Sequence, residues 1–142
     1  MDDCPRQPGS PTAGGPGSTL RSVTFVYNAI LFLHFIGMAL LVGGFFSQMR
    51  AEPRLVTQWM RDGALTQVVT GLALAGMAGS AVGTDAVFSP AAVGTKFAIA
   101  VIIAIIVLFG GRQPAEKQQT FWLAAGVLAL AEVAVAVFWL AA

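Results

Sequence analysis

Two ionisable residues lie inside otherwise apolar runs of this sequence, and they are the residues best placed to do chemistry. Glu132 lies in the stretch LALAEVAVAVFWL, residues 128–140, and His34, the only histidine, lies in ILFLHFIGMALL, residues 30–41. A charged side chain at the centre of a bilayer costs about 2.5–3.5 kcal/mol on insertion scales. If these runs cross a membrane, Glu132 therefore needs either a proton or a partner.

The sequence predicts that these two residues lie at one depth. Counted from the side where both chain ends would emerge, His34 is ~10 residues and Glu132 ~9 residues into its apolar segment, which places both roughly 14–15 Å deep. The first and fourth helices of an up-down bundle are usually neighbours. We therefore expect Glu132 and His34 to hydrogen-bond to each other, with Tyr27 or Gln67 as further partners.

Three interpretations of this intramembrane polar pair are open. One is a polar contact that fixes the register of two helices, as polar side chains commonly do in membranes. Another is proton or cation handling, because intramembrane acids and histidines mark such routes. The last is haem or metal ligation by His34, with Met38, Glu132 or a second protomer supplying the other axial ligand of a b-type haem. No nucleophile or second acid accompanies the pair, so we predict no catalytic residues, no metal site and no enzyme.

The composition indicates that lipid surrounds most of the chain. Of the 142 residues, 56% are hydrophobic and 11% are charged, and the mean hydropathy is +0.76. A soluble domain carries about 25% charged residues. The net charge of +1 argues against a nucleic-acid partner, because such binding depends on a concentrated basic surface. Arginines outnumber lysines, which is typical of a bacterial source with a GC-rich genome.

Four apolar segments are each close to the ~20 residues that cross a bilayer core as a helix. The segment with the lowest apolar content is the second, which consists mainly of Ala, Gly and Thr. Short connections containing proline or glycine separate the segments and leave no room for an extramembrane catalytic domain. The prediction is an all-α polytopic membrane protein, a four-transmembrane-helix up-down bundle over residues 21–142, with helices at about 24–49, 63–82, 92–110 and 119–141.

The ends and loops of the chain suggest an orientation. Residues 1–20 are rich in Pro, Gly and Ser, and we expect a disordered tail there and no signal peptide. The positive-inside rule places the loops with more Lys and Arg in the cytoplasm. We therefore expect a plasma-membrane protein with both termini outside, because the first and third loops carry Arg50, Arg54, Arg61, Arg112 and Lys117.

Small residues spaced four apart predict the faces on which these helices pack, because such spacing lets helix backbones approach closely in lipid. The second segment carries such a row at Gly71, Ala75, Gly79 and Gly83, and the first at Ala39, Gly43 and Ser47. In the fourth segment, Ala125 and Ala129 lie on the same face as Glu132, which we therefore expect to point into the bundle.

The remaining polar and aromatic residues near the segment ends have simpler expected roles. Lys96 is expected to extend its ammonium to the membrane interface. Trp59, Trp122 and Trp139 are expected to anchor helix ends at the interface, where aromatic side chains concentrate.

Two stretches also carry a family resemblance. ILFLHFIGMALLVGGFFSQMRAEPR, residues 30–54, and RDGALTQVVTGLALAG, residues 61–76, resemble uncharacterised small four-helix integral membrane proteins of actinobacteria, over about residues 24–142. This resemblance implies the topology and the source, and no activity. The spacing of His34 with Gly43 and Gly44 is also distantly similar to copper-resistance CopD-like membrane proteins, which often have a tryptophan where this chain has Val42.

These observations favour a non-enzymatic accessory or structural membrane subunit. Its expected partners are the lipid bilayer and either further copies of the chain or a larger membrane complex. The alternative is a small proton or metal-ion transporter, or a haem-binding redox membrane protein, that uses His34 and Glu132.

Overall fold

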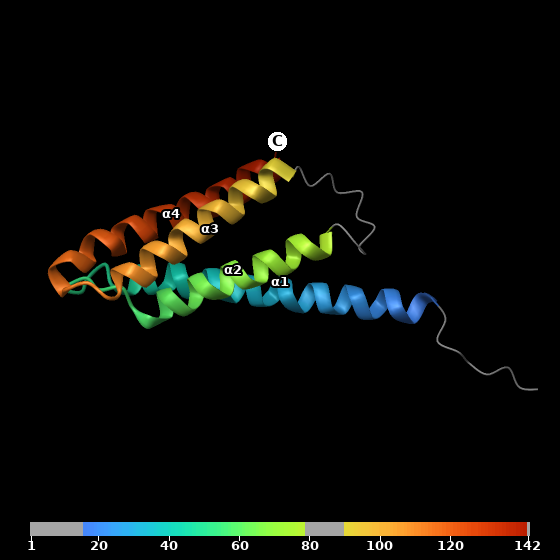
Figure 1. Cartoon of the computed structure of the whole chain (residues 1–142), viewed down its shortest axis with the longest axis horizontal. Helices are drawn as coiled ribbons and strands as arrows, with labels where there is room; N and C mark the ends of the chain where they lie inside the picture. Colours follow the sequence, from blue (N-terminus) through green and yellow to red (C-terminus); the bar gives the residue numbers. More distant parts are fainter. Residues whose placement is uncertain (1–15, 79–89, 142) are drawn as a thin grey trace, which may run out of the picture.

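The computed structural model describes residues 16–78 and 90–141, and every regular element in these ranges is an α-helix. The four helices are α1 (Pro16–Ser47), α2 (Gln58–Ala78), α3 (Pro90–Gly110) and α4 (Ala115–Ala141) (Figure 1). The helical class and the order of four helices are therefore confirmed over the described residues.

The helix ends follow ordinary capping chemistry. The Thr57 hydroxyl oxygen accepts a hydrogen bond from the backbone N–H of Met60 at 3.3 Å, which satisfies one free donor at the start of α2. α3 begins with Pro90, a residue suited to a first turn because its missing N–H would have no helical partner there. Glu116 lies in the first turn of α4, where a negative charge complements the helix dipole.

Three helices begin at least four residues before the expected position. α1 begins at Pro16, inside the segment expected to be a disordered tail, while residues 1–15 lie outside the described residues. α2 begins at Gln58 and α4 at Ala115, so parts of both expected loops are helical. The extra turns at the start of α2 and α4 contain charged and amide side chains, so a search for continuous apolar residues did not include them.

Three of the four helices are long and apolar enough to cross a membrane. The spans are Arg21–Ser47, Ala91–Gly110 and Ala115–Phe138, which supports a membrane location for the protein. Within the described residues, α2 does not reach the same apolar content, because polar residues such as Arg61, Asp62 and Gln67 interrupt it. The helix expected to be least apolar is therefore the one whose membrane crossing is not confirmed.

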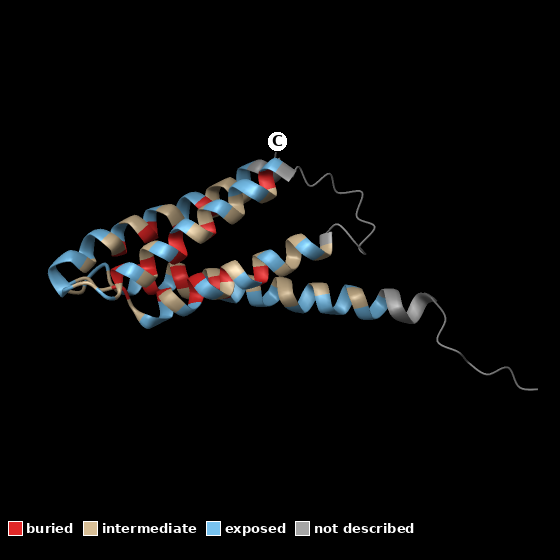
Figure 2. Ribbon diagram, viewed as in Figure 1, coloured by how far each residue is buried: buried red, intermediate tan, exposed pale blue. Residues whose placement is uncertain are grey.

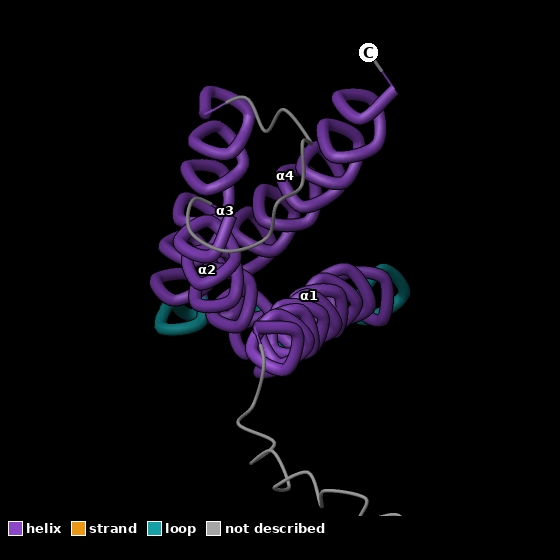
Figure 3. Tube along the Cα trace, turned by 90° about the vertical axis from the view of Figure 1, so that its right-hand side faces the viewer, coloured by secondary structure: helices purple, strands orange, loops and turns teal. Residues whose placement is uncertain are grey.

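The helices pair as two antiparallel hairpins, α1 with α2 and α3 with α4. Figure 1 shows the hairpins meeting at the end that carries residues 48–57 and 111–114, which we call the loop end. They diverge toward the opposite end, the open end, where α1 begins and α4 finishes. The end-on view in Figure 3 places α2 between α1 and α3, and the packing of α2 on α3 joins the hairpins. α1 also contacts α4, as expected of first and fourth helices.

The apolar core lies mainly in the half of the molecule nearer the loop end (Figure 2). Its central members come from all four helices and from the loop before α2. They are Leu41, Phe45, Val56, Met60, Ala64, Ile103, Ala104, Val107, Trp122, Ala125 and Ala129.

The outer surface is apolar as well, which is the reverse of a water-soluble bundle. Phe25, Phe32, Val69 and Phe138 are each about two-thirds exposed or more, at 75%, 66%, 66% and 73%. Large exposed apolar surfaces on a protein mark contact with a membrane or another protein. This surface supports the membrane location that the three apolar helices indicate.

Candidate functional site

His34 is held by α2. Its ring nitrogen Nδ1 lies 2.8 Å from the hydroxyl oxygen of Thr70. The Thr70 hydroxyl donates its single proton to the backbone carbonyl of Thr66, one turn earlier in α2. Thr70 can therefore only accept from His34, so Nδ1 is the donor. In the neutral ring, Nε2 is then the acceptor nitrogen.

Gln67, one helical turn before Thr70 in α2, also connects α2 to α1. Its amide Nε2 donates to the backbone carbonyl oxygen of His34 at 2.9 Å, and the side chain is almost fully buried, with 1% exposed. This bond fixes which end of the amide is the nitrogen, because a carbonyl can only accept. The amide oxygen Oε1 is buried and has no hydrogen-bond partner among the described residues.

Close backbone packing explains why α2 reaches His34. A Cβ added at Gly63 would lie 2.7 Å from the Gly37 carbonyl oxygen and 2.7 Å from the Leu41 nitrogen. A Cβ at Gly71 would lie 3.4 Å from the His34 ring. Only glycine lets the two backbones come this near, so α2 lies within reach of the imidazole.

Glu132 lies on the face of α4 that also carries Ala125 and Ala129. All three are buried, with 5% of Glu132 exposed and none of either alanine, which agrees with the expected inward direction of this face. The carboxylate oxygen Oε2 is buried and has no hydrogen-bond partner in the part of the chain that the structure describes. Glu132 is therefore a buried carboxylate without a hydrogen-bonded partner at that oxygen.

The hydrogen bond expected between His34 and Glu132 is not formed in the structure. The His34 Nδ1 donor is used by Thr70, and α1 packs more extensively on α2 than on α4. Nor does Tyr27 take part in this site, since it is seven residues before His34, about 10 Å along α1. Of the two further partners expected, Gln67 does bind His34, but its side chain binds the His34 backbone carbonyl oxygen rather than the ring. The partner of the ring is Thr70, which was not among the predicted residues.

Lys96 in α3 is a cationic side chain whose charge acts on this region. It is half-buried and lies within electrostatic range of both His34 and Glu132, although no ion pair joins it to either. A residue expected only to reach the interface thus contributes positive charge to the same part of the bundle. The polar side chains of this region, the polar cluster, are His34, Gln67, Thr70, Lys96 and Glu132.

The predicted packing rows are only partly used within the chain. Gly71 and Ala75 are half-buried on α2, while Gly79 and Gly83 lie outside the described residues. The row Ala39, Gly43 and Ser47 is exposed, and a Cβ added at Gly43 meets nothing within 4 Å. Within the single chain, this row therefore packs against no other helix, and its role as a packing face stays a prediction.

Other glycines of α1 make its contact with α2. Gly37 and Gly44 are buried, and a Cβ at Gly44 would lie 2.6 Å from the Met60 side chain. Gly37 and Gly44 are seven residues apart and therefore lie on one face of α1, with Gly63 of α2 opposite. This spacing differs from the four-residue spacing on which the predicted rows were based.

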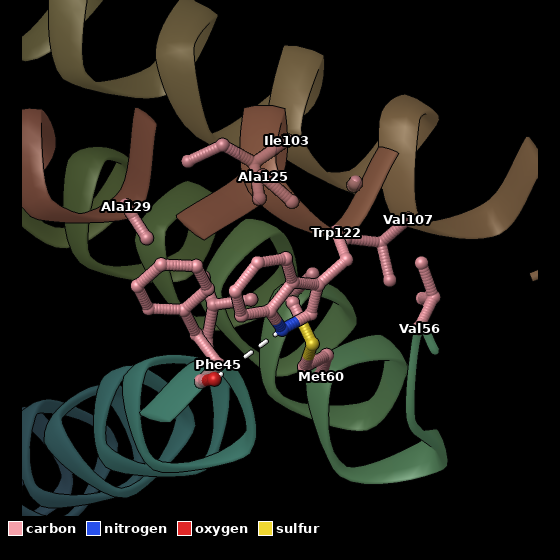
Figure 4. Close-up of a cluster of buried hydrophobic side chains, with 11 residues drawn as sticks. Phe45, Val56, Met60, Ile103, Val107, Trp122, Ala125 and Ala129 are labelled. Carbon is pink, nitrogen blue, oxygen red and sulfur yellow. Dashed lines mark hydrogen bonds between the residues drawn. The ribbon is translucent and has the colours of Figure 1, made fainter. Parts of the chain in front are cut away.

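Trp122 is a core residue rather than an interfacial anchor. Only 4% of it is exposed, and it packs among Phe45, Met60 and Val107 (Figure 4). The guanidinium carbon of Arg54 lies 5.4 Å from its ring centroid, within cation–π range. Trp59 is 64% exposed, as an anchor would be, and the Trp139 side chain lies outside the described ones.

The described residues hold no group of three or more His, Cys, Asp or Glu side chains that could share a metal ion. Haem or metal ligation by His34 stays a prediction. No protein-family model matches the chain, and the comparisons with curated proteins and with solved structures also found no match.

Proposed function

We propose that the chain is a four-span protein of a bacterial plasma membrane, with both termini outside, that acts as a non-enzymatic structural subunit and assembles with further copies of itself. The case for a fourth span is positional. α2 is antiparallel to α1 and lies between α1 and α3, two helices that are apolar enough to cross a membrane. A helix in that place shares their depth, and its polar side chains Gln67 and Thr70 are buried among protein rather than lipid.

The exposed row of small residues on α1 carries the proposal of self-assembly. Ala39, Gly43 and Ser47 lie on one face at intervals of four, and the chain itself covers none of them. In lipid, such rows support helix association because they permit close backbone packing. A shallow surface hollow follows the row, and its lining residues are Ala39, Leu40, Gly43, Gly44, Ser47 and Trp59.

A second copy is the occupant that this row favours. Two copies related by a two-fold axis place the same row against itself, so a single surface supplies both halves of the contact. Ser47 adds little polarity, because its hydroxyl already donates to the Gly44 carbonyl at 2.8 Å. The contact would therefore depend on close packing.

Self-association of the purified protein in lipid vesicles tests this proposal. Copies labelled with donor and acceptor dyes are expected to show energy transfer that increases with protein density in the membrane. Gly43→Leu fills the row and is expected to lower that transfer. Gly94→Leu is the matched control, because Gly94 is also exposed and helical, and a Cβ there meets nothing within 4 Å. Equal transfer in the two variants, or no transfer in the wild type, would refute self-assembly through this face.

A further inference from the structure

Basic side chains from separate parts of the chain gather at the loop end. Residues 48–62 and 111–118 contain more basic than acidic residues, so this end of the protein carries a net positive charge. The basic residues are Arg50, Arg54, Arg61, Arg112 and Lys117, and the acidic residues are Glu52, Asp62 and Glu116.

Hydrogen bonds and a ring contact hold the two segments of the loop end against each other. Gln118 of α4 joins them, because its Oε1 accepts from the backbone N–H of Val56 at 3.1 Å and its Nε2 donates to the Gln113 carbonyl oxygen at 2.7 Å. The guanidinium carbon of Arg54 lies 5.4 Å from the ring centroid of Trp122, also in α4. The loops before α2 and before α4 therefore form one surface.

Arg61 brings the charge of α2 to this surface, beside Arg112. A Cβ added at Gly111 would lie 3.4 Å from Cδ and 3.8 Å from Nε of Arg61, so the Arg61 side chain lies against the turn between α3 and α4. Arg112 is the next residue of that turn and is exposed. Because Arg61 is half-buried, packing restricts where its guanidinium can lie. Two arginines from different helices thus occupy neighbouring places on the surface.

The surface lies where the apolar spans end. The span of α1 ends at Ser47 and that of α3 at Gly110. Arg50 and Arg112 come within one helical turn after these ends, and Arg61 packs beside the second. The polar headgroups of a bilayer lie directly outside its hydrocarbon core, which is the part that apolar spans cross. These basic residues are therefore at headgroup level, on whichever side of the membrane the loop end lies.

We propose that the loop end binds the headgroup of an anionic phospholipid, with Arg61 and Arg112 as the main contacts. Guanidinium groups suit this ligand because their N–H groups match the oxygens of a phosphate in pairs. Charge provides the selectivity, since phosphatidylglycerol has a net negative charge, whereas the choline group of phosphatidylcholine offsets its phosphate. This inference requires the membrane location but not self-assembly, because one chain supplies both arginines.

Native mass spectrometry of the full chain tests the proposal by counting the lipids that stay bound. The protein is released from nanodiscs that contain equal amounts of phosphatidylglycerol and phosphatidylcholine. We expect it to retain phosphatidylglycerol in an excess of about fivefold or more, because one basic side chain near a charged lipid surface contributes about that factor. Equal retention of the two lipids would overturn the proposal.

Substitutions locate the bound lipid on the protein. Arg61→Gln combined with Arg112→Gln removes both charges and should bring the ratio of retained lipids close to one. Arg61→Lys combined with Arg112→Lys keeps the charges and should keep part of the preference. Arg21→Gln is the matched control, because Arg21 is also an exposed arginine but lies near the start of α1, at the open end. An equal ratio in the paired Gln variant and in this control would show that Arg61 and Arg112 are not the contacts.

Two measurements on the unmodified protein test the ligand without any substitution. Raising the salt concentration to about 1 M shortens the range of charge interactions to about 3 Å, so the excess of retained phosphatidylglycerol should fall. Inorganic phosphate should lower it no more than chloride does at the same ionic strength. A ratio that does not respond to salt would contradict selection by charge. A specific loss with inorganic phosphate would show that the surface binds free phosphate rather than a lipid headgroup.

Discussion

The indole of Trp122 stacks on the ring of Phe45, with the two ring centroids 4.6 Å apart and the planes inclined by 27°. The indole Nε1 also donates to the Phe45 backbone carbonyl oxygen at 3.3 Å. These contacts join α4 to α1, a helix pair with fewer contacts than either hairpin. Together with the packing of α2 on α3, these two side chains hold the hairpins together at the loop end.

Replacing Trp122 should destabilise the protein far more than replacing Trp59. Trp122→Ala removes a buried aromatic side chain, which costs about 3–5 kcal/mol in folded proteins. Trp59→Ala alters a side chain that is 64% exposed, and its effect should stay within about 0.5 kcal/mol. Unfolding by a denaturing detergent in mixed micelles measures both free energies. Similar losses for the two variants would contradict the assignment of Trp122 to the core.

Gly126 should tolerate no side chain while Phe45 is present. A Cβ at Gly126 would overlap the Phe45 ring, and the Trp122 stack prevents that ring from moving away. We expect Gly126→Ala to lower the free energy of unfolding by about 1–3 kcal/mol, as overpacking does. In a Phe45→Ala background the same change should cost much less. Gly94→Ala is the control, since a Cβ there meets no neighbour. An equal cost of Gly126→Ala in both backgrounds would show that Phe45 is not the cause.

The hydrogen bond between His34 and Thr70 should be measurable as a contribution to stability. Thr70→Val keeps the shape and removes the acceptor, so we expect a loss of about 0.6 kcal/mol, the average for interhelical hydrogen bonds in membranes, and at most about 1.7 kcal/mol. Thr95→Val is matched to it, because the exposed Thr95 hydroxyl donates only within α3, to the Ala91 carbonyl. Nitrogen NMR of the ring should also find the His34 proton on Nδ1 in the wild type. An unprotonated Nδ1 would contradict the donor assignment.

The sequence was sufficient to predict four helices and the inward face of α4, because apolar length and the burial of a lone acid are strong constraints in lipid. The sequence alone does not determine which small residues of α1 face the other helices and which face the outside. In water, a polar stripe would mark the outside of a helix, but here Gly43 and Gly44 are both surrounded by apolar residues. Which of these glycines is buried therefore depends on the face of α1 against which α2 packs. That face is set by the close approach of the two backbones at Gly37 and Gly63.

The hydrogen-bond partner of His34 could not be predicted from the sequence for a related reason. Depth along a helix can be counted from the sequence, and it placed His34 and Glu132 at similar levels. The distance between helices depends on which backbones approach most closely, and the glycines at the α1–α2 contact favour Thr70 over Glu132. Trp122 was misassigned because nearness to a helix end does not reveal that Phe45 and Val56 cover the indole.

If α1, α3 and α4 cross a membrane together, the divergence of the two hairpins gives the described part of the protein a taper along the membrane normal. A body that is narrower at the loop end than at the open end displaces unequal areas of lipid from the two leaflets. Many such bodies in one patch favour bending of that patch, with the convex surface on the side of the wider end. Sorting of the protein between flat and curved regions of membrane is therefore an expected property of its shape alone.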